Sequence, residues 1–419
     1  MFCFSRQPTL IPSDGSVRIK SSAMRIRGLN FSAWATLFAA TRGLLERPQH
    51  VFIALCDHFE PMWQRPALHV QNARVERWVR EYPESVAGIC DSSGRPPQHT
   101  FFYPGDEYDA GHVDKIAALR RDGYGDVEVH LHHRHDTSAS LREKLESYVR
   151  ILRDRHGLLG QDASGKITYG FIHGNWALDN SRPDGDWCGV NDEITILRQT
   201  GCYADFTMPS APDACQTTTI NSIYYALDDP NRPKSHDRGI VAQVGATPPS
   251  DGLLMIQGPL AVDWGSRKWG LLPRLENGEL TGRRPPSMKR FGLWCRAGIC
   301  VSGRADWRFI KLHTHGAQEL NAAMLLGERM RNFHVMLREA ASRLPQFKYY
   351  YVTAREVASL VQQAERGNVV PAWPPESPPT EIPDEAESGS NESIPTRGQL
   401  SAPTTKNRNT EAPQGISAT

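Results

Sequence analysis

The sequence predicts an α/β fold: a (β/α) barrel, seven-stranded and imperfectly closed, with a large irregular insertion and a disordered C-terminal tail. From about His50 to Gly367, short apolar runs alternate with amphipathic helical patterns, which is typical of parallel strands joined by crossover helices. Residues 208–305 interrupt this alternation and are rich in Pro, Gly, Trp and Asp. Residues 374–419 contain no Phe, Trp or Tyr, so they bury too little apolar surface to offset the entropy of ordering.

The first strand is expected at 51–55, where a continuous apolar run suits burial on both faces. Further strands are expected at 100–103, 126–129, 167–172, 202–206, 253–256, 309–312 and 349–352. Helices are expected at 70–82, 113–121, 139–155, 192–200, 317–343 and 353–366, with Thr137–Ser138 as a cap. We therefore divide the chain into an N-terminal extension (1–48), a body (49–367) with its insertion (208–305), and a tail (368–419). A helix packed outside the core is one interpretation of residues 32–45.

Charge and composition exclude several classes of protein. The 48 basic and 47 acidic residues give a formal net charge of +1, which does not indicate a nucleic acid or an anionic membrane as partner. No run of about 18 apolar residues predicts a transmembrane segment. The eight cysteines form no CxxC pair, which is typical of a reduced cytoplasmic protein, although another export route is left open.

The most informative segment is Glu128–Asp136, which reads Glu-Val-His-Leu-His-His-Arg-His-Asp and holds four histidines. It lies between a predicted strand and a predicted helix, which is the active-site end of α/β folds. His130 and His132 share one strand face, and Asp136 follows four residues after His132. Imidazole and carboxylate at this spacing suit zinc or a related divalent ion. The alternative is an ordinary solvated strand end.

Three other predicted strands end in polar residues. Their ends are Asp57-His58-Phe59-Glu60, His173-Gly174-Asn175-Trp176 and His313-Thr314-His315-Gly316. Asp57 beside His58 offers a base next to a metal ligand. Gly174 allows a close backbone approach, and Trp176 either stacks on a sugar ring or packs as part of the core. These distant ends converge if the strands are parallel neighbours.

In their order and setting, these motifs resemble the polysaccharide deacetylases, the NodB-homology domain of carbohydrate esterases. The resemblance covers roughly 50–145 and 305–360. Asp57 matches the family's general base, and His58 stands where its metal-binding second Asp would be. His132, in Glu128–His132, matches the first metal histidine, and Asp136 stands where the second belongs. Leu312-His313 resembles the motif of the general acid, and 350–357 resembles the closing strand and helix.

The resemblance implies a metal-dependent hydrolase that removes N- or O-acetyl groups from a saccharide or polysaccharide, with zinc as the expected metal. The metal ligands would be His58, His132 and Asp136 together with His130, while His133 and His135 are alternative ligands. Asp57 would act as base, and His313 or the nearby His315 as acid. Apart from the resemblance, the strand end at 173–176 offers His173, Asn175 and Trp176 as substrate-binding residues. The chain departs from the family at Thr207–Pro212, which lacks the Arg of the third motif, and at His130, where the family has glycine.

Two other functions remain open from the sequence. His130-Leu131-His132 and His313-Thr314-His315 are both His-x-His pairs, which favours a phosphoesterase or an amidohydrolase. A non-catalytic carbohydrate-binding or assembly protein on a deacetylase scaffold is the other alternative.

Overall fold

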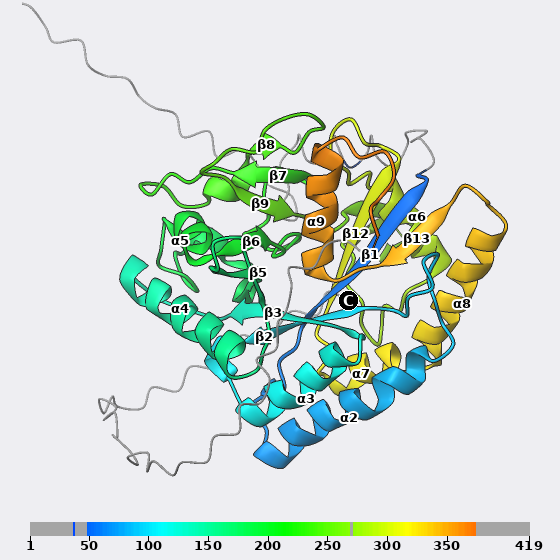
Figure 1. Ribbon diagram of the computed structural model, residues 1–419, viewed down its shortest axis with the longest axis horizontal. Coiled ribbons are helices and arrows are strands. Elements are labelled where there is room, and N and C mark those ends of the chain that lie inside the picture. Colours follow the sequence, from blue (N-terminus) through cyan, green and yellow to red (C-terminus); the bar gives the residue numbers. More distant parts are fainter. Residues whose placement is uncertain (1–36, 38–47, 269–270, 374–419) are drawn as a thin grey trace, which may run out of the picture.

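The computed structural model describes residues 37, 48–268 and 271–373. Its fold is mixed α/β, with a mostly parallel β-sheet at the centre (Figure 1). Apart from Leu37, the helix expected at 32–45 lies outside the described residues, as does 374–419 of the expected tail. The first residues of that predicted tail belong to the body: the Ala372 N–H donates to the Gln363 side chain at 2.9 Å, and the Trp373 ring lies 5.1 Å from the Tyr350 ring.

The strand order confirms the parallel arrangement. Across the sheet the strands are β12 (Trp307–Thr314), β1 (His50–His58), β2 (His99–Pro104), β3 (Gly125–Leu131), β5 (Ile167–His173), β6 (Cys202–Asp205), β9 (Leu253–Ile256), β7 (Ile223–Ala226) and β8 (Ile240–Val241). Every pair from β12 to β9 is parallel, and β7 and β8 add antiparallel. β13 (Lys348–Tyr351) pairs parallel with the start of β1, and β4 (Gly160–Gln161) pairs with β5. In the described part of the chain β12 and β8 end the sheet, so barrel closure stays a prediction.

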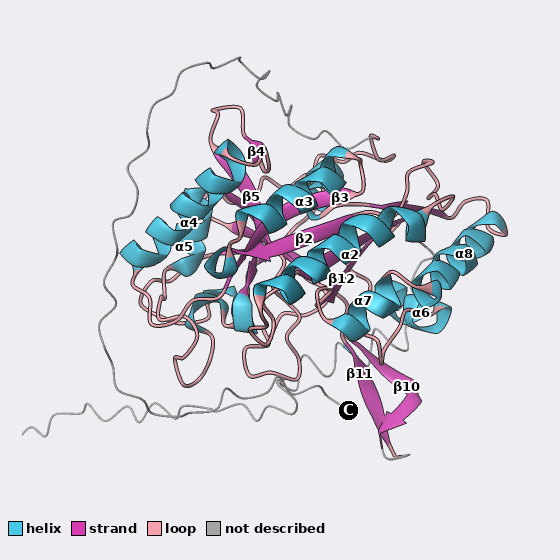
Figure 2. Ribbon diagram, turned by 90° about the horizontal axis from the view of Figure 1, so that it is seen from below, coloured by secondary structure: helices cyan, strands magenta, loops and turns pink. Residues whose placement is uncertain are grey.

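Helices cover both faces of the sheet. One face packs on α2 (Leu68–Val86), α3 (Ala110–Arg121), α4 (Ser138–Asp154), α5 (Glu193–Thr200), α6 (Met288–Arg296), α7 (Glu319–Leu325) and α8 (Glu328–Ser342). Figure 2 shows α2 and α3 in front of the strands on this face. The other face packs on α9 (Ala354–Glu365), which is held by Thr353 through a capping box.

Side chains of β1 alternate between these two faces. Ile53 and Leu55 pack on the α2 face, whereas Ala54 and Cys56 pack on the α9 face. This period of two decides where each polar residue at the end of the strand points.

The single helix expected at 317–343 is wrong, because two helices, α7 and α8, occupy this segment. Gly327 separates them with φ −106° and ψ −176°, which is extended rather than helical backbone. A Cβ at Gly327 would lie 2.5 Å from the Ala323 carbonyl oxygen, so glycine suits this break.

The insertion expected at 208–305 contains more regular structure than its composition predicts. It adds β7, β8 and β9 to the sheet, and it contains α6 and the ribbon of β10 (Ala261–Lys268) and β11 (Leu272–Glu276), which projects from the body (Figure 2).

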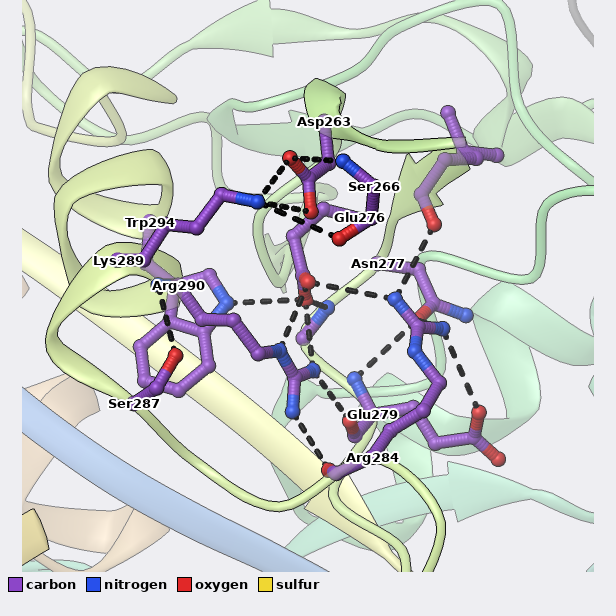
Figure 3. A network of polar contacts seen from close by, with 12 residues as sticks. Asp263, Ser266, Glu276, Asn277, Glu279, Arg284, Ser287, Lys289, Arg290 and Trp294 are labelled. Atoms are coloured by element: carbon purple, nitrogen blue, oxygen red, sulfur yellow. Dashed lines mark hydrogen bonds and ion pairs between the residues drawn. The ribbon is translucent and has the colours of Figure 1, made fainter. Parts of the chain in front are cut away.

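A buried ion pair anchors this ribbon beside β12. The Glu276 carboxylate, 1% exposed, accepts two hydrogen bonds of 2.8 Å from Arg290 of α6 and one of 3.0 Å from Trp294 (Figure 3). The chain after Glu276 then runs along the end of β12, where the Leu280 N–H donates to the His313 carbonyl at 2.8 Å. The network therefore holds the strand end that carries His313.

No described helix is both long and apolar enough to cross a membrane.

Candidate metal centre

The carboxyl ends of three parallel strands bring four histidines and one glutamate together. His58 ends β1, His130 and His132 lie at the end of β3, His315 follows β12, and Glu60 follows β1 by two residues. Glu60, His130 and His132 offer ligand atoms that all lie within 4.8 Å of one another, and so do Glu60, His58 and His315. Glu60 is therefore shared by the two groups.

Two of the histidines present the same ring nitrogen to Glu60. The Nε2 atoms of His130 and His132 lie 3.2 and 3.5 Å from Glu60 Oε1. His130 Nδ1 donates to the Ile172 carbonyl at 2.8 Å, and His132 Nδ1 lies 3.3 Å from the Asp106 carboxylate. A partner on Nδ1 fixes the tautomer and leaves Nε2 as the ligand atom, which is the usual arrangement around metal-binding histidines.

The charges of this group also suit a cation. Burial opposes a charge on Glu60, but hydrogen bonds with His130 and His132 hold the pKa of its carboxyl well below the usual range. Burial likewise opposes a charge on His132, yet Asp106 and Glu60 raise the pKa of the ring to about 10. The same carboxylates that favour a proton on His132 would also favour a divalent ion at this position. Glu60, His130 and His132 fit such an ion, because two imidazoles and one carboxylate form a common zinc ligand set.

His58 lies between the two groups: its ring centroid is 4.9 Å from that of His315 and 4.9 Å from that of His130. Burial, together with the imidazoles of His315 and His130, lowers the pKa of His58 well below its usual value. His313 lies behind, with its ring centroid 6.3 Å from that of His58. It is 4% exposed, whereas His315 is half-buried. Of the two predicted acids, His315 is the one with access to solvent.

One side of the site is open. The side chains of His132 and Asp106 are 25% and 34% exposed, while that of His130 is fully buried. Gly174, directly after β5, makes room for the His132 ring: a Cβ there would lie 2.3 Å from His132 Cδ2. The close approach expected at Gly174 is thus confirmed, and a side chain of the protein occupies the space. Exposure on one side is typical of a catalytic rather than a structural metal site.

Asp57 does not join this group. β1 continues through His58, so Asp57 points to the α2 face while His58 points to the α9 face. The Asp57 carboxylate is fully buried, 2.8 Å from His99 Nε2, and accepts the Gly316 N–H at 2.6 Å. It thereby joins β1 to β2 and to the chain after β12, while the prediction that it acts as base stays untested.

Asp136 is also separate from His58 and His132. Its carboxylate accepts two hydrogen bonds of 2.8 Å from Lys144 and one of 2.8 Å from Ser140, and it lies 3.2 Å from His133. The structure therefore brings together His58, His130 and His132 of the predicted ligands, and it adds Glu60 in place of Asp136. The His135 side chain is 71% exposed and lies 3.9 Å from Asp186.

The three residues predicted to bind substrate do not share one surface. His173 is fully buried beside His133, with 4.5 Å between ring centroids. Asn175 and Trp176 have positive φ values of 56° each, and Trp176 packs partly buried against the core. This contact matches the packing alternative for Trp176.

Sequence reasoning missed two acidic residues near the site. Asp106 and Glu107 lie in the 3₁₀ turn η1 (Gly105–Glu107), directly after β2. Burial, with the nearby carboxylates of Glu60 and Asp106, raises the pKa of Glu107 to about 7. The signal was present, because acids after a buried parallel strand lie at the same edge as the histidines.

Comparison with known proteins adds little. No family model matches the sequence, and no curated protein matches it significantly. Among solved structures, the chain is similar to 4-alpha-glucanotransferase from Thermococcus litoralis, with a TM-score of 0.39 and 12% identity. The match covers 75% of this chain and 40% of that one. A likeness this weak carries no argument about function.

Proposed function

We propose that the protein is a metal-dependent hydrolase in which Glu60, His130 and His132 hold one divalent ion, zinc. The observation that carries this proposal is the pair of Nε2 atoms that face Glu60 Oε1 at 3.2 and 3.5 Å, each on a ring whose Nδ1 is engaged elsewhere. Three protein ligands of the His₂Glu type leave a coordination position for water or substrate, which is the pattern of catalytic zinc sites.

The bound metal would polarise the acyl carbonyl and lower the pKa of a water molecule. We assign the proton transfers to His315, which is half-buried and, like the two ligand histidines, has a ring nitrogen within 4.8 Å of a Glu60 oxygen. His315 takes a proton from the attacking water as the water oxygen bonds to the acyl carbon. The bond from that carbon to the leaving oxygen or nitrogen then breaks, and His315 gives its proton to the leaving atom. His58, beside His315, limits the positions that the ring of His315 can adopt.

The substrate class we propose is an acetylated saccharide or polysaccharide. Support comes from the resemblance of Asp57, Glu128–His132 and Leu312-His313 to deacetylase motifs, and from the common strand edge at which these segments end. We also propose that this chain has the barrel architecture of that family.

The test is acetate release from an acetylated oligosaccharide by zinc-loaded protein. His315→Gln should reduce turnover by roughly 10²–10⁴-fold, the usual contribution of a positioned acid–base group, while the metal content stays near that of wild type. His69→Gln is the control, because His69 is exposed on α2. Full activity of His315→Gln, or equal loss in the control, would contradict the assignment.

One observation favours a second candidate, a phosphoesterase or amidohydrolase. Both His-x-His pairs reach the site, since His130 and His132 face Glu60 while His313 and His315 lie near His58. Hydrolysis of an aryl phosphate or an N-acyl amino acid, with no acetate released from the oligosaccharide, would favour this candidate. Bound metal without turnover of any of these substrates would instead favour a non-catalytic role.

A further inference from the structure

A second group of potential ligands lies on the other side of β3 and β5, beneath α4 and α5. It consists of His133 after β3, His173 at the end of β5, Cys188 in the loop before α5, and Glu193 at the start of α5. His133 is 4% exposed and the other three are fully buried. All four ligand atoms lie within 4.8 Å of one another.

Both imidazoles are held so that Nε2 faces Glu193. His133 Nδ1 lies 3.2 Å from Asp136, and His173 Nδ1 contacts the Gly174 carbonyl oxygen. The Nε2 atoms of His133 and His173 then lie 3.1 and 3.7 Å from Glu193 Oε1. His173 Nε2 is buried without a hydrogen-bond partner. A buried polar atom without a partner is costly, so its orientation toward three other potential ligands indicates an absent partner.

Cys188 and Glu193 complete the group. Cys188 Sγ accepts the N–H groups of Asn180 and Val190 at 3.3 and 3.4 Å, and it lies 3.3 Å from Glu193 Oε2. The Cys188 thiol can also donate its proton to Glu193 Oε2 or to the Val190 carbonyl oxygen at 3.4 Å. A bound metal would displace this proton, because the thiolate is the form that binds metal. Glu193 Oε2 also accepts the Asp179 N–H at 2.6 Å, which leaves Oε1 directed toward the two imidazoles.

We propose that His133, His173, Cys188 and Glu193 bind a structural zinc ion. Two imidazoles, one thiolate and one carboxylate supply the four ligands of a closed tetrahedral site. One thiolate and one carboxylate also neutralise the charge of the ion, which suits a site buried away from water. Asp136, itself bound by Lys144 at 2.8 Å, is the carboxylate that orients His133 from behind. Asp136 would thus orient a metal ligand, whereas the sequence predicted that Asp136 is itself a ligand.

The structural zinc would also position the first site. His133 directly follows His132, and His173 directly precedes Gly174, against which the His132 ring packs. A metal that ties β3 to β5 and α5 therefore holds the backbone that carries His132. The four residues of this zinc site lie outside the proposed catalytic group, so the site does not depend on hydrolase activity.

Cobalt substitution distinguishes the two sites, because a thiolate is present among the second group of ligands and absent from the first. Cobalt-loaded wild-type protein should show a thiolate-to-cobalt charge-transfer band in the near ultraviolet. Cys188→Ser should lose this band, while Cys215→Ser, which alters another fully buried cysteine, should keep it. His132→Ala should lose up to one equivalent of metal and keep the band, which separates failure of this inference from failure of the proposed function.

Zinc X-ray absorption on the wild-type protein provides a measurement that needs no variant. The inference predicts a zinc–sulfur shell at about 2.3 Å. Absence of both the cobalt band and the sulfur shell would overturn the proposed zinc site. The four residues would then form a buried cluster held by the His133–Glu193 ion pair. A band that survives in folded Cys188→Ser would also overturn the proposed zinc site.

Discussion

Asp106 provides a sharp test of the proposed metal site, because its carboxylate contacts His132 directly. Its Oδ1 accepts the His132 backbone N–H at 2.9 Å and lies 3.3 Å from the ring Nδ1. Asp106→Asn keeps an oxygen that can accept the backbone hydrogen bond, so the turn should persist. It removes the negative charge that makes the His132 ring a better ligand.

The expected effect on metal affinity follows from the geometry. Loss of a carboxylate behind a ligand histidine costs about 10–100-fold in affinity, or roughly 1.4–2.8 kcal/mol. The Asp106 side chain is 34% exposed, so solvent screens its charge. We therefore expect a loss near the lower end of this range, about tenfold.

The assay is a competition titration with a chromophoric chelator, which measures zinc affinity directly. Asp109→Asn is the matched control: Asp109 caps α3 by accepting the His112 N–H at 3.0 Å, and Asn caps helices as well as Asp does. Unchanged affinity in folded Asp106→Asn would refute the role given to Asp106 behind His132, as would an equal loss in the control.

Three further predictions concern stability. Glu276→Gln should lower the free energy of unfolding by about 3–5 kcal/mol, because it leaves the buried Arg290 without its charge partner. The control is Glu279→Gln, which should cost under about 1 kcal/mol, because the Glu279 side chain is 32% exposed and its ion pair with Arg284 is 4.0 Å long. Denaturant titration of both variants measures the two losses. Asp57→Asn should cost about 1–3 kcal/mol through its buried hydrogen bonds and leave the metal content unchanged, so loss of metal would contradict its placement. Burial lowers the pKa of His334 to about 3. The unfolded chain therefore binds a proton at this residue below pH ~6.5 and the folded protein does not, so the contribution of His334 to the free energy of unfolding falls by roughly 2 kcal/mol between pH 7 and 5. His334→Leu should flatten this part of the stability–pH curve, and an unchanged slope would argue against a neutral buried ring.

The period of apolar residues predicted much of the fold. β1, β3, β5 and β12 each contain the run expected from the sequence, and Thr137 caps α4 as expected. The strand ends were harder to predict, because β1 runs on to His58 rather than ending at Leu55. That continuation sends Asp57 and His58 to opposite faces, since side chains alternate along a strand. A pairing of these two residues in one site holds only if the strand stops before them.

The periodicity of the sequence could not predict which distant loops come together in the fold. Cys188 and Glu193 lie in and after a loop without regular spacing relative to His133 or His173. These residues come together because α5 packs beside α4. A lone cysteine without a CxxC partner gave no metal signal. Glu60 was recognised as an acid after the first strand but not as a metal ligand, because its position depends on how the chain turns after β1.

Anomalous diffraction from zinc-soaked crystals tests the central claim most directly. The proposed site predicts a peak about 2.0–2.2 Å from His130 Nε2, His132 Nε2 and a Glu60 oxygen. The peak should disappear in Glu60→Ala crystals while the fold is retained. A zinc-saturated crystal with no peak among these three residues would contradict the claim that they form a metal centre.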